Sequence, residues 1–189
     1  MKVEQIYTGC LAQGAYYIES NGEAAIVDPL REVEPYIKKA ASDGARIKYV
    51  LETHFHADFV SGHLDLSKQS GGTIIYGPTA KPAFPAHVAS DGEVFQLGNI
   101  TLTVLHTPGH TQGSTSIWIP SENKLIAGDT LFRDSIGRTD LPGGNSRQIL
   151  RSIEDKLLPL PEETIVIAGH GPNTSIGREK ERNPFLQGL

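Results

Sequence analysis

The sequence predicts an α+β fold in which a mixed two-sheet core carries its helices on the outside. Short apolar strands recur along the chain, and turn signals separate them. The elements follow the order strands, helix, strand, helix, strands, helix, strand. That order fits two packed sheets flanked by helices, although periodicity alone leaves several α+β folds open. The length of 189 residues suits a single domain, 1–189, with a core large enough to fold alone.

The first elements are predicted to be strands. Residues 5–7 and 15–18 are rich in aromatic and β-branched side chains, which favour strands. The Asn-Gly pair at 21–22 is a strong hairpin signal, and the apolar residues 24–27 follow it as the returning strand. This strand ends before Pro29, because proline cannot donate a hydrogen bond to a ladder.

Helices and short strands alternate in the next part of the chain. Residues 34–43 predict a helix, and Gly44 is typical of a helix C-terminus. Residues 49–51 predict a short buried strand. A second helix is expected at 64–70 and a further strand at 73–76.

The C-terminal half predicts a second group of strands and one helix. Residues 92–98 and 100–105 form a hairpin in this prediction, and Ile100, Leu102 and Val104 alternate onto one face of its second arm. Two more strands, an amphipathic helix and a last strand are predicted at residues 116–119, 124–127, 146–156 and 164–168.

Composition and charge exclude several classes of function. The formal net charge is -5 and no basic stripe stands out, which argues against a nucleic-acid partner. The N-terminus lacks the apolar region of a secretory signal, and no apolar run approaches the ~20 residues that cross a bilayer. Cys10 is the single cysteine, so an internal disulfide cannot form. We expect a cytoplasmic protein with no membrane partner, in which Cys10 is a buried, inert thiol rather than a reactive one.

The segment His-Phe-His-Ala-Asp at 54–58 holds three ligand-type side chains. Imidazole and carboxylate groups suit zinc, iron or manganese. Because side chains two residues apart point the same way in extended backbone, His54 and His56 can reach one ion, and Asp58 can reach the same side. Taken alone, the segment also fits a polar loop with two unrelated histidines.

Three later segments favour the metal interpretation. Each places a ligand-type residue just after an apolar strand, namely His110 on a Pro-Gly turn, Asp129 after Gly128, and His170 after Gly169. Glycine permits close approach of the backbone, and the carboxyl ends of strands are where open-sheet enzymes gather their chemistry. Independent strands that end in this way indicate a metal site at one edge of the core.

The order of these motifs resembles the metallo-β-lactamase superfamily. The motifs are His-x-His-x-Asp at 54–58, Pro-Gly-His at 108–110, Gly-Asp-Thr at 128–130 and Gly-His-Gly at 169–171. The likeness extends over residues 5–186 and implies an αββα sandwich of four layers, with the metal at one edge between the sheets.

The resemblance implies two metal positions, one bound by His54, His56 and His110 with Asp129 in contact, and one bound by Asp58, His170 and a bridging Asp129. Asp58 would also act in catalysis, since it would orient the attacking water or accept its proton.

Phe59 departs from the family pattern. Glyoxalase-II-like members carry a histidine directly after the motif aspartate, and that histidine binds the second metal. Phenylalanine cannot coordinate an ion, so the second position keeps three protein ligands. Three ligands still hold zinc when water completes the shell, but the affinity is expected to fall. A single-metal enzyme is therefore an alternative.

Two groups within the superfamily compete as the nearest resemblance. The C-terminal half is similar to small bacterial glyoxalase-II-like thioester hydrolases at 135–144, 169–174 and 183–186. The N-terminal half is similar to persulfide dioxygenases and their rhodanese-fused relatives at 9–12 and 52–63.

The dioxygenase relatives hold one Fe(II) by a His-His-Asp triad, which would map onto His54, His110 and Asp129. Since both resemblances use the same residues, ligand identity does not separate them.

Hydrolysis of a glutathione thioester, in the manner of a hydroxyacylglutathione hydrolase, is the favoured prediction. The C-terminal segments, the chain length and the absence of a rhodanese segment favour it, and metal-bound hydroxide would attack the thioester carbonyl. A mononuclear Fe(II) persulfide dioxygenase is the first alternative, and a weakly active metal-binding or thiol-sensing module is the second. The expected cofactor is therefore one or two Zn²⁺ ions, or Fe²⁺, and the expected partner is a small thiol-derived substrate, a glutathione conjugate.

Arg138 lies where relatives place a cation for the carboxylate of glutathione, and the alternative is an ion pair with Asp134 or Asp140. The chain lacks the long C-terminal helical extension with which larger glyoxalase II enzymes grip glutathione. We expect either loose specificity or a site completed by a second copy in a homodimer.

Other side chains are assigned supporting roles. Asp28 either orients a ligand imidazole from behind or simply forms a turn before Pro29. The hydroxyls of Thr53 and Thr130 are candidates to bond ligand side chains. Three histidines fall outside the motifs and are expected in the core or on the surface: His63, His87 and His106.

Overall fold

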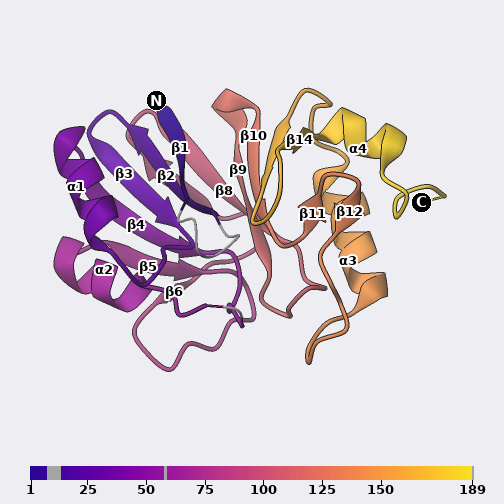
Figure 1. Cartoon of the computed structure of the whole chain (residues 1–189), viewed down its shortest axis with the longest axis horizontal. Coiled ribbons are helices and arrows are strands. Elements are labelled where there is room, and N and C mark those ends of the chain that lie inside the picture. Colours follow the sequence, from indigo (N-terminus) through magenta and orange to yellow (C-terminus); the bar gives the residue numbers. More distant parts are fainter. Residues whose placement is uncertain (8–13, 58, 189) are drawn as a thin grey trace.

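The computed structural model describes residues 1–7, 14–57 and 59–188. Two six-stranded sheets form its centre, and helices cover the outer face of each sheet (Figure 1). The first sheet has the order β1-β2-β3-β4-β5-β6, with strands Lys2–Tyr7, Gly14–Ser20, Glu23–Val27, Arg46–Glu52, Thr73–Tyr76 and His87–Val88. The second has the order β14-β13-β10-β9-β8-β7, with strands Thr174–Ser175, Ile165–Ala168, Lys124–Gly128, Thr115–Ile119, Ile100–His106 and Val94–Leu97.

Both sheets are mixed. The strands β1, β2 and β3 are antiparallel, while β3, β4, β5 and β6 run parallel. In the second sheet the meander from β7 to β10 is antiparallel, and β13 then pairs parallel with β10. A small hairpin of β11 (Leu131–Phe132) and β12 (Ser135–Ile136) follows β10. Parallel neighbours direct their carboxyl ends to one edge, which is where the predicted ligands follow.

Three apolar clusters hold the layers together. One lies between the sheets and joins side chains such as Ile18 and Leu51 to Leu102 and Ile117. A second packs α1 (Glu34–Ser42) and α2 (His63–Ser70) against the first sheet. A third packs α3 (Ser146–Ser152), its π-helical continuation Ile153–Leu157 and α4 (Ile176–Arg182) against the second sheet. The αββα sandwich implied by the resemblance is therefore confirmed.

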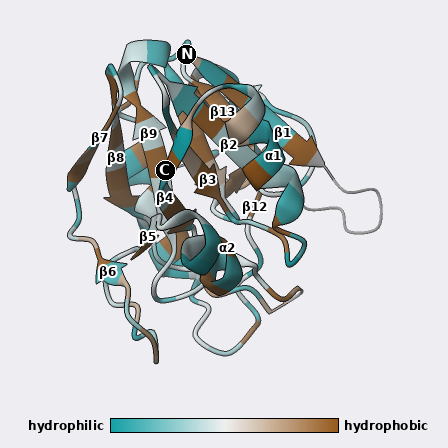
Figure 2. Cartoon of the chain, turned by 90° about the vertical axis from the view of Figure 1, so that its left-hand side faces the viewer, coloured by the Kyte–Doolittle hydropathy of each residue, from teal (hydrophilic) through white to brown (hydrophobic). Residues whose placement is uncertain are grey.

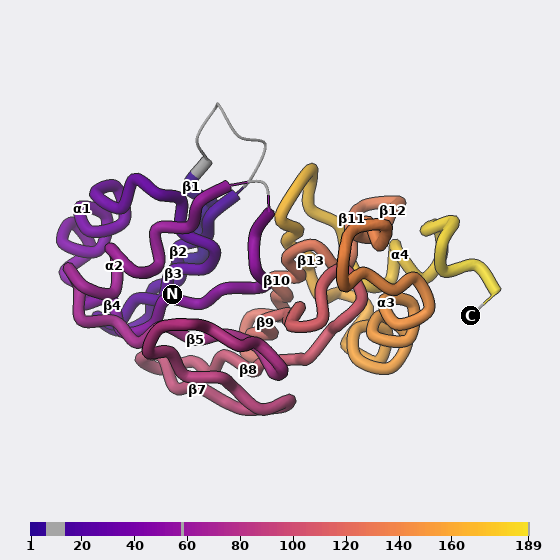
Figure 3. Tube along the Cα trace, turned by 90° about the horizontal axis from the view of Figure 1, so that it is seen from below, coloured from indigo at the N-terminus to yellow at the C-terminus, as the bar shows by residue number. Residues whose placement is uncertain are grey.

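The hydropathy pattern follows these layers. In Figure 2 much of the brown colouring falls on the strands, whereas α2 is largely teal where it faces outward. Figure 3 shows the indigo and purple N-terminal elements on one side and the orange and yellow C-terminal elements on the other, with β9 and β10 between them. In the described part of the chain, no helix is long and apolar enough to cross a membrane.

Local sequence signals explain the first hairpin. Asn21 and Gly22 have φ of 49° and 79°, and β2 pairs with β3 across them in continuous register. Positive φ at both central positions is the geometry that the Asn-Gly pair favours. The hairpin predicted at 21–22 is confirmed.

Several short elements were not predicted. These are β6, β11, β12 and β14, each two residues long, together with α4. Two-residue strands carry no periodicity to read. The helix α4 is short and highly charged, so it has no apolar pattern that predicts a helix. The side chain of Ser175 caps its N-terminus, where it accepts a hydrogen bond from the Arg178 N–H at 3.3 Å.

Candidate metal centre

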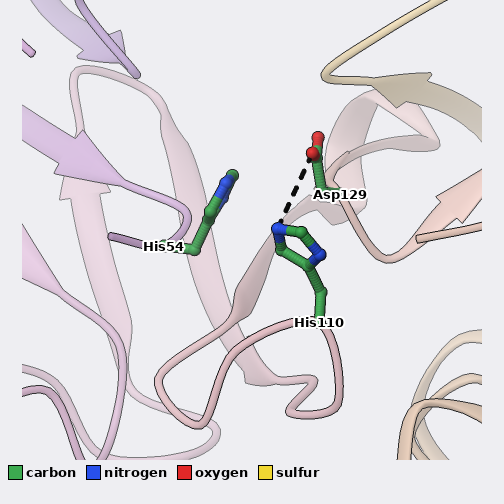
Figure 4. A group of neighbouring side chains, drawn as sticks. All are labelled: His54, His110 and Asp129. Atoms are coloured by element: carbon green, nitrogen blue, oxygen red, sulfur yellow. Dashed lines mark ion pairs between the residues drawn. The ribbon is translucent and has the colours of Figure 1, made fainter. Parts of the chain in front are cut away.

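Three ligand-type side chains converge at the edge where the two sheets meet (Figure 4). His54 follows β4, His110 lies in the loop between β8 and β9, and Asp129 directly follows β10. Each offers a ligand atom that lies within 4.8 Å of those of the other two. The Nε2 atom of His110 is 3.8 Å from Oδ2 of Asp129, and the ring centroids of His54 and His110 are 4.9 Å apart. These three residues, His54, His110 and Asp129, form the metal group, which is thus assembled from the ends of separate strands.

Two glycines allow the backbones to approach this closely. Gly128 has φ of +49°, and a Cβ there would lie 2.6 Å from Oγ1 of Thr53, across the gap between the sheets. A Cβ at Gly169 would lie 2.4 Å from Oδ1 of Asp129. Both distances are shorter than non-bonded carbon contacts allow, so any side chain would push the metal group apart. The predicted role of glycine before Asp129 and before His170 is confirmed.

His170 lies on the other side of the same carboxylate. Its Nε2 atom is 3.5 Å from Oδ2 of Asp129, and its side chain is 34% exposed. The side chain of Asp129 is 13% exposed. It lies between the buried His110 and the more accessible His170. The carboxylate of Asp129 thus faces His110 on one side and His170 on the other.

The hydrogen bonds of His54 and His110 leave the same ring atom of each free for an ion. Oγ1 of Thr53 donates to Oδ2 of Asp28 at 2.7 Å, so it accepts from Nδ1 of His54 at 2.9 Å. Nδ1 of His110 donates to the carbonyl oxygen of Arg138 at 2.9 Å. In both rings the unprotonated Nε2 then faces the site, as is common for metal-binding histidines.

His56 is held apart from the metal group by two carboxylates. Its Nε2 atom lies 3.1 Å from Oδ1 of Asp28 and 3.2 Å from Oε2 of Glu52, so this nitrogen is occupied. The ring of His56 nevertheless lies 4.1 Å from that of His54. Its Nδ1 atom is buried and has no hydrogen-bond partner among the described residues. Any contact of His56 with an ion would therefore be made through Nδ1.

Burial and charge set the protonation of the site. Burial lowers the pKa of His54 to about 4, which keeps the ring neutral. Burial also favours the neutral form of His56, but the carboxylates of Asp28 and Glu52 outweigh it and raise the pKa of that ring. For Asp129, burial is outweighed by His170, His54 and His110, and its pKa falls below the usual range. An ionised carboxylate beside a neutral imidazole is the state that a cation requires.

The residues fit a divalent cation. Oδ1 of Asp129 is buried without a hydrogen-bond partner among the described residues, although an ionised carboxylate in a protein is normally saturated with donors. Two imidazoles and one carboxylate in this arrangement match the ligand sets of zinc and iron enzymes that leave positions open for substrate.

Asp28 connects the two imidazoles to the fold. It is 1% exposed, its Oδ1 accepts the backbone N–H of Thr53 at 2.7 Å, and its φ is +51°. The same carboxylate faces His56 and, through Thr53, His54. Both interpretations of Asp28 thus find support in its geometry, since it ends β3 in a turn and also lies behind the two rings.

The structure places two of the remaining predicted residues, Arg138 and Thr130. The guanidinium of Arg138 forms a bidentate ion pair with Asp140, at 2.9 and 2.8 Å, and the residue also lines the smaller cavity. The hydroxyl of Thr130 is buried and lies 3.1 Å from that of Thr107, with no hydrogen bond to a ligand side chain among the described residues, so its predicted role stays a prediction. Asp58, Cys10 and the segment 9–12 lie outside the described residues.

Glu52 is a site residue that the sequence analysis missed. It is 1% exposed, it accepts a hydrogen bond from Ser61, and burial raises its pKa. His63 lies behind it, with Nδ1 at 3.5 Å from Oε1 of Glu52. A signal was available, since Glu52, His54 and His56 share one alternation at the end of an apolar strand.

Two adjoining cavities open beside the metal group. The smaller, of about 270 Å³, is lined by His54, Ala57, His110, Asp129, Arg138, Leu141 and His170. The larger, of about 730 Å³, shares Ala57, His110 and Leu141 with it and extends toward Phe55. The smaller cavity thus contacts all three residues of the metal group, and the larger one adjoins it at His110.

Comparison with known proteins agrees with the fold and the motif order. A family model described as the metallo-beta-lactamase superfamily matches residues 8–170. The probable metallo-hydrolase YqgX of Bacillus subtilis is 36% identical over 211 residues, which cover 100% of this chain and 99% of that protein. The hydroxyacylglutathione hydrolase GloC of Haemophilus influenzae is 36% identical over 210 residues, which cover 98% of both chains.

A solved structure offers a second point of comparison. The chain is similar to ETHE1 from Myxococcus xanthus, with a TM-score of 0.90 and 29% identity over 97% of this chain and 84% of that one. The matched region of the family model contains every element that contributes to the metal group.

Proposed function

The chain belongs to the metallo-β-lactamase superfamily, and we propose that it is a metal-dependent hydrolase of glutathione thioesters. The observation that carries the proposal is the position of Asp129. Its Oδ2 atom lies 3.8 Å from Nε2 of His110 and 3.5 Å from Nε2 of His170. A carboxylate between two imidazoles suits a hydrolytic centre of one or two ions.

A divalent cation held by His54, His110 and Asp129 would supply a water of lowered pKa and polarise the thioester carbonyl. The chain's own residues prepare this site. Thr53 and the carbonyl of Arg138 fix the orientation of the two imidazoles. We assign His56 to the same ion through Nδ1, and Asp58 and His170 to the second position.

The reaction exchanges one bond at the acyl carbon. A C–O bond to the attacking oxygen forms and the C–S bond breaks, so that a carboxylate and a thiol leave the site. We assign to Asp58 the proton of the attacking water, on the strength of the motif. Arg138 borders the smaller cavity, and its guanidinium is proposed to meet a carboxylate of the glutathione half.

The proposal is tested on protein purified without added metal, by elemental analysis together with two assays. Hydrolysis of S-lactoylglutathione is followed by thiol release, and oxygen uptake is followed with glutathione persulfide. We expect thiol release, zinc or iron in the protein, and no oxygen uptake. Metal-loaded protein that leaves the thioester intact contradicts the proposal.

One observation favours a second candidate, a mononuclear Fe(II) persulfide dioxygenase. The ligand atoms of His54, His110 and Asp129 lie within 4.8 Å of one another without a contribution from His170. The ring centroid of Phe59 lies 4.2 Å from that of His56, and Phe59 occupies the sequence position at which glyoxalase-II-like members carry a further ligand. Two histidines and one carboxylate are the ligand set of many non-haem iron oxygenases. One iron per chain with persulfide-dependent oxygen uptake would replace the first proposal with this one.

The cytoplasmic location, the homodimer and the single-domain organisation 1–189 remain predictions from the sequence. Sedimentation of the purified chain at micromolar concentration tests the homodimer directly.

A further inference from the structure

The larger cavity, of about 730 Å³, has no role in the chemistry described so far. Its volume lies within the range of sites that enclose a whole small molecule. The three-carbon lactoyl group of a simple hydroxyacyl thioester would fill only a minor part of it. The cavity therefore has room for a much larger substituent next to the metal group.

The walls of this cavity are tied to one another. Oγ1 of Thr79 donates to the carbonyl of Gln112 at 2.8 Å, and Nε2 of Gln112 donates to the carbonyl of Gly143 at 3.4 Å. Thr79 has φ of +67°, which is costly for a β-branched residue. Hydrogen bonds thus link three of the loops that line the cavity.

Phe55 presents an aromatic ring to the cavity. It is 44% exposed, although it lies between His54 and His56 in the most buried part of the site. Its ring stacks on Tyr76 with centroids 4.7 Å apart and an interplanar angle of 27°. Tyr76 is 2% exposed, so the phenylalanine ring rests on the core. An ordered aromatic face beside a reaction centre is a platform for another apolar or aromatic group.

The remaining lining defines which ligands fit. Alanine, proline and leucine side chains contribute at Ala57, Ala80, Leu141 and Pro142. Among the described residues that line it, none is acidic and Lys81 is the one lysine or arginine. An apolar group that is neutral or anionic is therefore favoured over a cationic one.

The relation between the two cavities assigns one arm of the substrate to each. They share Ala57, His110 and Leu141, so His110 lies at their junction, while His54 and Asp129 line the smaller cavity. A thioester has two arms that meet at the reacting carbonyl. With the glutathione arm on the side of Arg138, the acyl arm extends toward Phe55.

We propose that the 730 Å³ cavity is an acyl subsite that selects thioesters with an aryl or long alkyl acyl group, with Phe55 as the residue that determines this specificity. The inference rests on the proposed thioester hydrolysis and names its substrate class.

Two glutathione thioesters that differ only in one substituent test the subsite. S-mandeloylglutathione carries a phenyl group where S-lactoylglutathione carries a methyl group. We expect the wild type to favour the mandeloyl ester by about 10-fold or more in kcat/KM. The replacement Phe55→Ala is expected to lower the ratio of the two kcat/KM values by about 10-fold, because the stacking face is lost.

A second variant acts at a distance from the metal group, since Phe55 is adjacent to two histidines. Ala80→Asp places a carboxylate on the apolar wall and is expected to lower the same ratio. Phe185→Ala is the matched control, because Phe185 is 51% exposed and lies outside the cavity lining. Its ratio should equal that of the wild type.

Calorimetric titration separates the failure of the subsite from the failure of the reaction. The probes are S-(2-phenylethyl)glutathione and S-ethylglutathione, which cannot be hydrolysed. One outcome is that neither thioester is hydrolysed, while the phenylethyl probe binds about 10-fold more tightly than the ethyl probe and Phe55→Ala and Ala80→Asp abolish that preference. This outcome refutes the reaction but supports the subsite. If both thioesters are hydrolysed with one ratio in wild type and variants, the subsite is refuted. The subsite is also refuted if the wild type prefers neither the mandeloyl ester over the lactoyl ester nor the phenylethyl probe over the ethyl probe.

Discussion

The two sheets contribute unlike halves to the metal site. On the first sheet, His54 is 4% exposed, and the side chain of His56 is 2% exposed, with Asp28 and Glu52 packed behind the rings. On the second sheet, His170 is 34% exposed at its side chain, lines the smaller cavity and lies 3.5 Å from the carboxylate of Asp129. The first half is buried throughout, while the second half ranges from the buried His110 to the accessible His170.

The contrast indicates how the work of the site is divided. Imidazoles that are fixed by buried hydrogen bonds lose little freedom when they bind an ion, so the first half favours affinity. An accessible histidine next to a cavity leaves room for substrate and water, so the second half favours exchange. Asp129 belongs to both halves, because its carboxylate faces the buried group and His170 alike.

Removal of the shared carboxylate should have the largest effect. Asp129→Ala is expected to lower thioester hydrolysis by at least about 100-fold, because the charge that holds the cation is lost. The fold should persist, since Oδ1 of Asp129 makes no hydrogen bond to the described residues. Initial rates and far-ultraviolet circular dichroism measure the two quantities.

The control for this experiment is Asp65→Asn, on the exposed side of α2. It should leave both rate and spectrum unchanged. Full activity of Asp129→Ala would contradict the central assumption that both halves of the metal site act through the carboxylate of Asp129.

The carboxylate behind the first half should have the next largest effect. Asp28→Asn keeps the shape of the side chain but weakens the acceptor for His56 and Thr53. Affinity for the first ion should fall by about 10- to 100-fold, as for other groups that orient metal-binding imidazoles. Competition with a chromophoric chelator measures this affinity. Asp43→Asn, a carboxylate paired with Lys2 away from the site, is the matched control.

A smaller effect is expected on the open side. His170→Ala should remove at most one ion per chain and should change affinity for the first ion by less than Asp28→Asn does, because His170 is outside the group of His54, His110 and Asp129. Elemental analysis and the same chelator competition give both values. Complete loss of metal in His170→Ala would show that the two halves bind as one unit.

The sequence predicted the ends of strands better than the hydrogen bonds between them. The positions of His54, His110, Asp129 and His170 follow from strands of ordinary periodicity, and the glycine before Asp129 marks a close approach. Such features are local, and local features can be read from spacing.

Features that depend on how two distant segments meet were not predictable. Asp28 reaches the ring of His56 only because β3 and β4 lie side by side, with Val27 paired to Leu51. The contact between the hydroxyls of Thr130 and Thr107 likewise joins residues that follow two different strands, β10 and β8. The larger cavity likewise arises from four separate segments, three of them linked by hydrogen bonds, that no single motif contains.

The last prediction uses the far end of β3, where Glu23 contrasts with Asp28 at the site. Glu23 accepts the Gly98 N–H at 2.9 Å and pairs with Lys48 at 2.8 Å and with Arg46 at 2.9 Å, so it ties the first sheet to the β7–β8 turn of the second. The Gly98 hydrogen bond, with the two cations, lowers the pKa of Glu23 from 4.5 to about 2.

A depressed pKa in the folded state means that the unfolded chain binds more protons at acidic pH. The stabilisation by Glu23 is therefore complete above pH 4.5 and is lost as pH falls from 4.5 toward about 2. Glu23→Gln should lower the free energy of unfolding by about 1 kcal/mol at pH 7, after allowance for solvent screening. Its difference from the wild type should shrink by more than half at pH 3, as measured by urea unfolding at both pH values.

The matched control is Glu163→Gln, an exposed glutamate that makes no ion pair within the described chain. Its stability should follow the wild type at both pH values. Metal content should be normal in both variants, because Glu23 and Asp28 are at opposite ends of one strand and only the latter touches the imidazoles. A difference between Glu23→Gln and wild type that stayed constant with pH would mean that the side chain acts through packing rather than charge, and a loss of metal would couple the far end of β3 to the site.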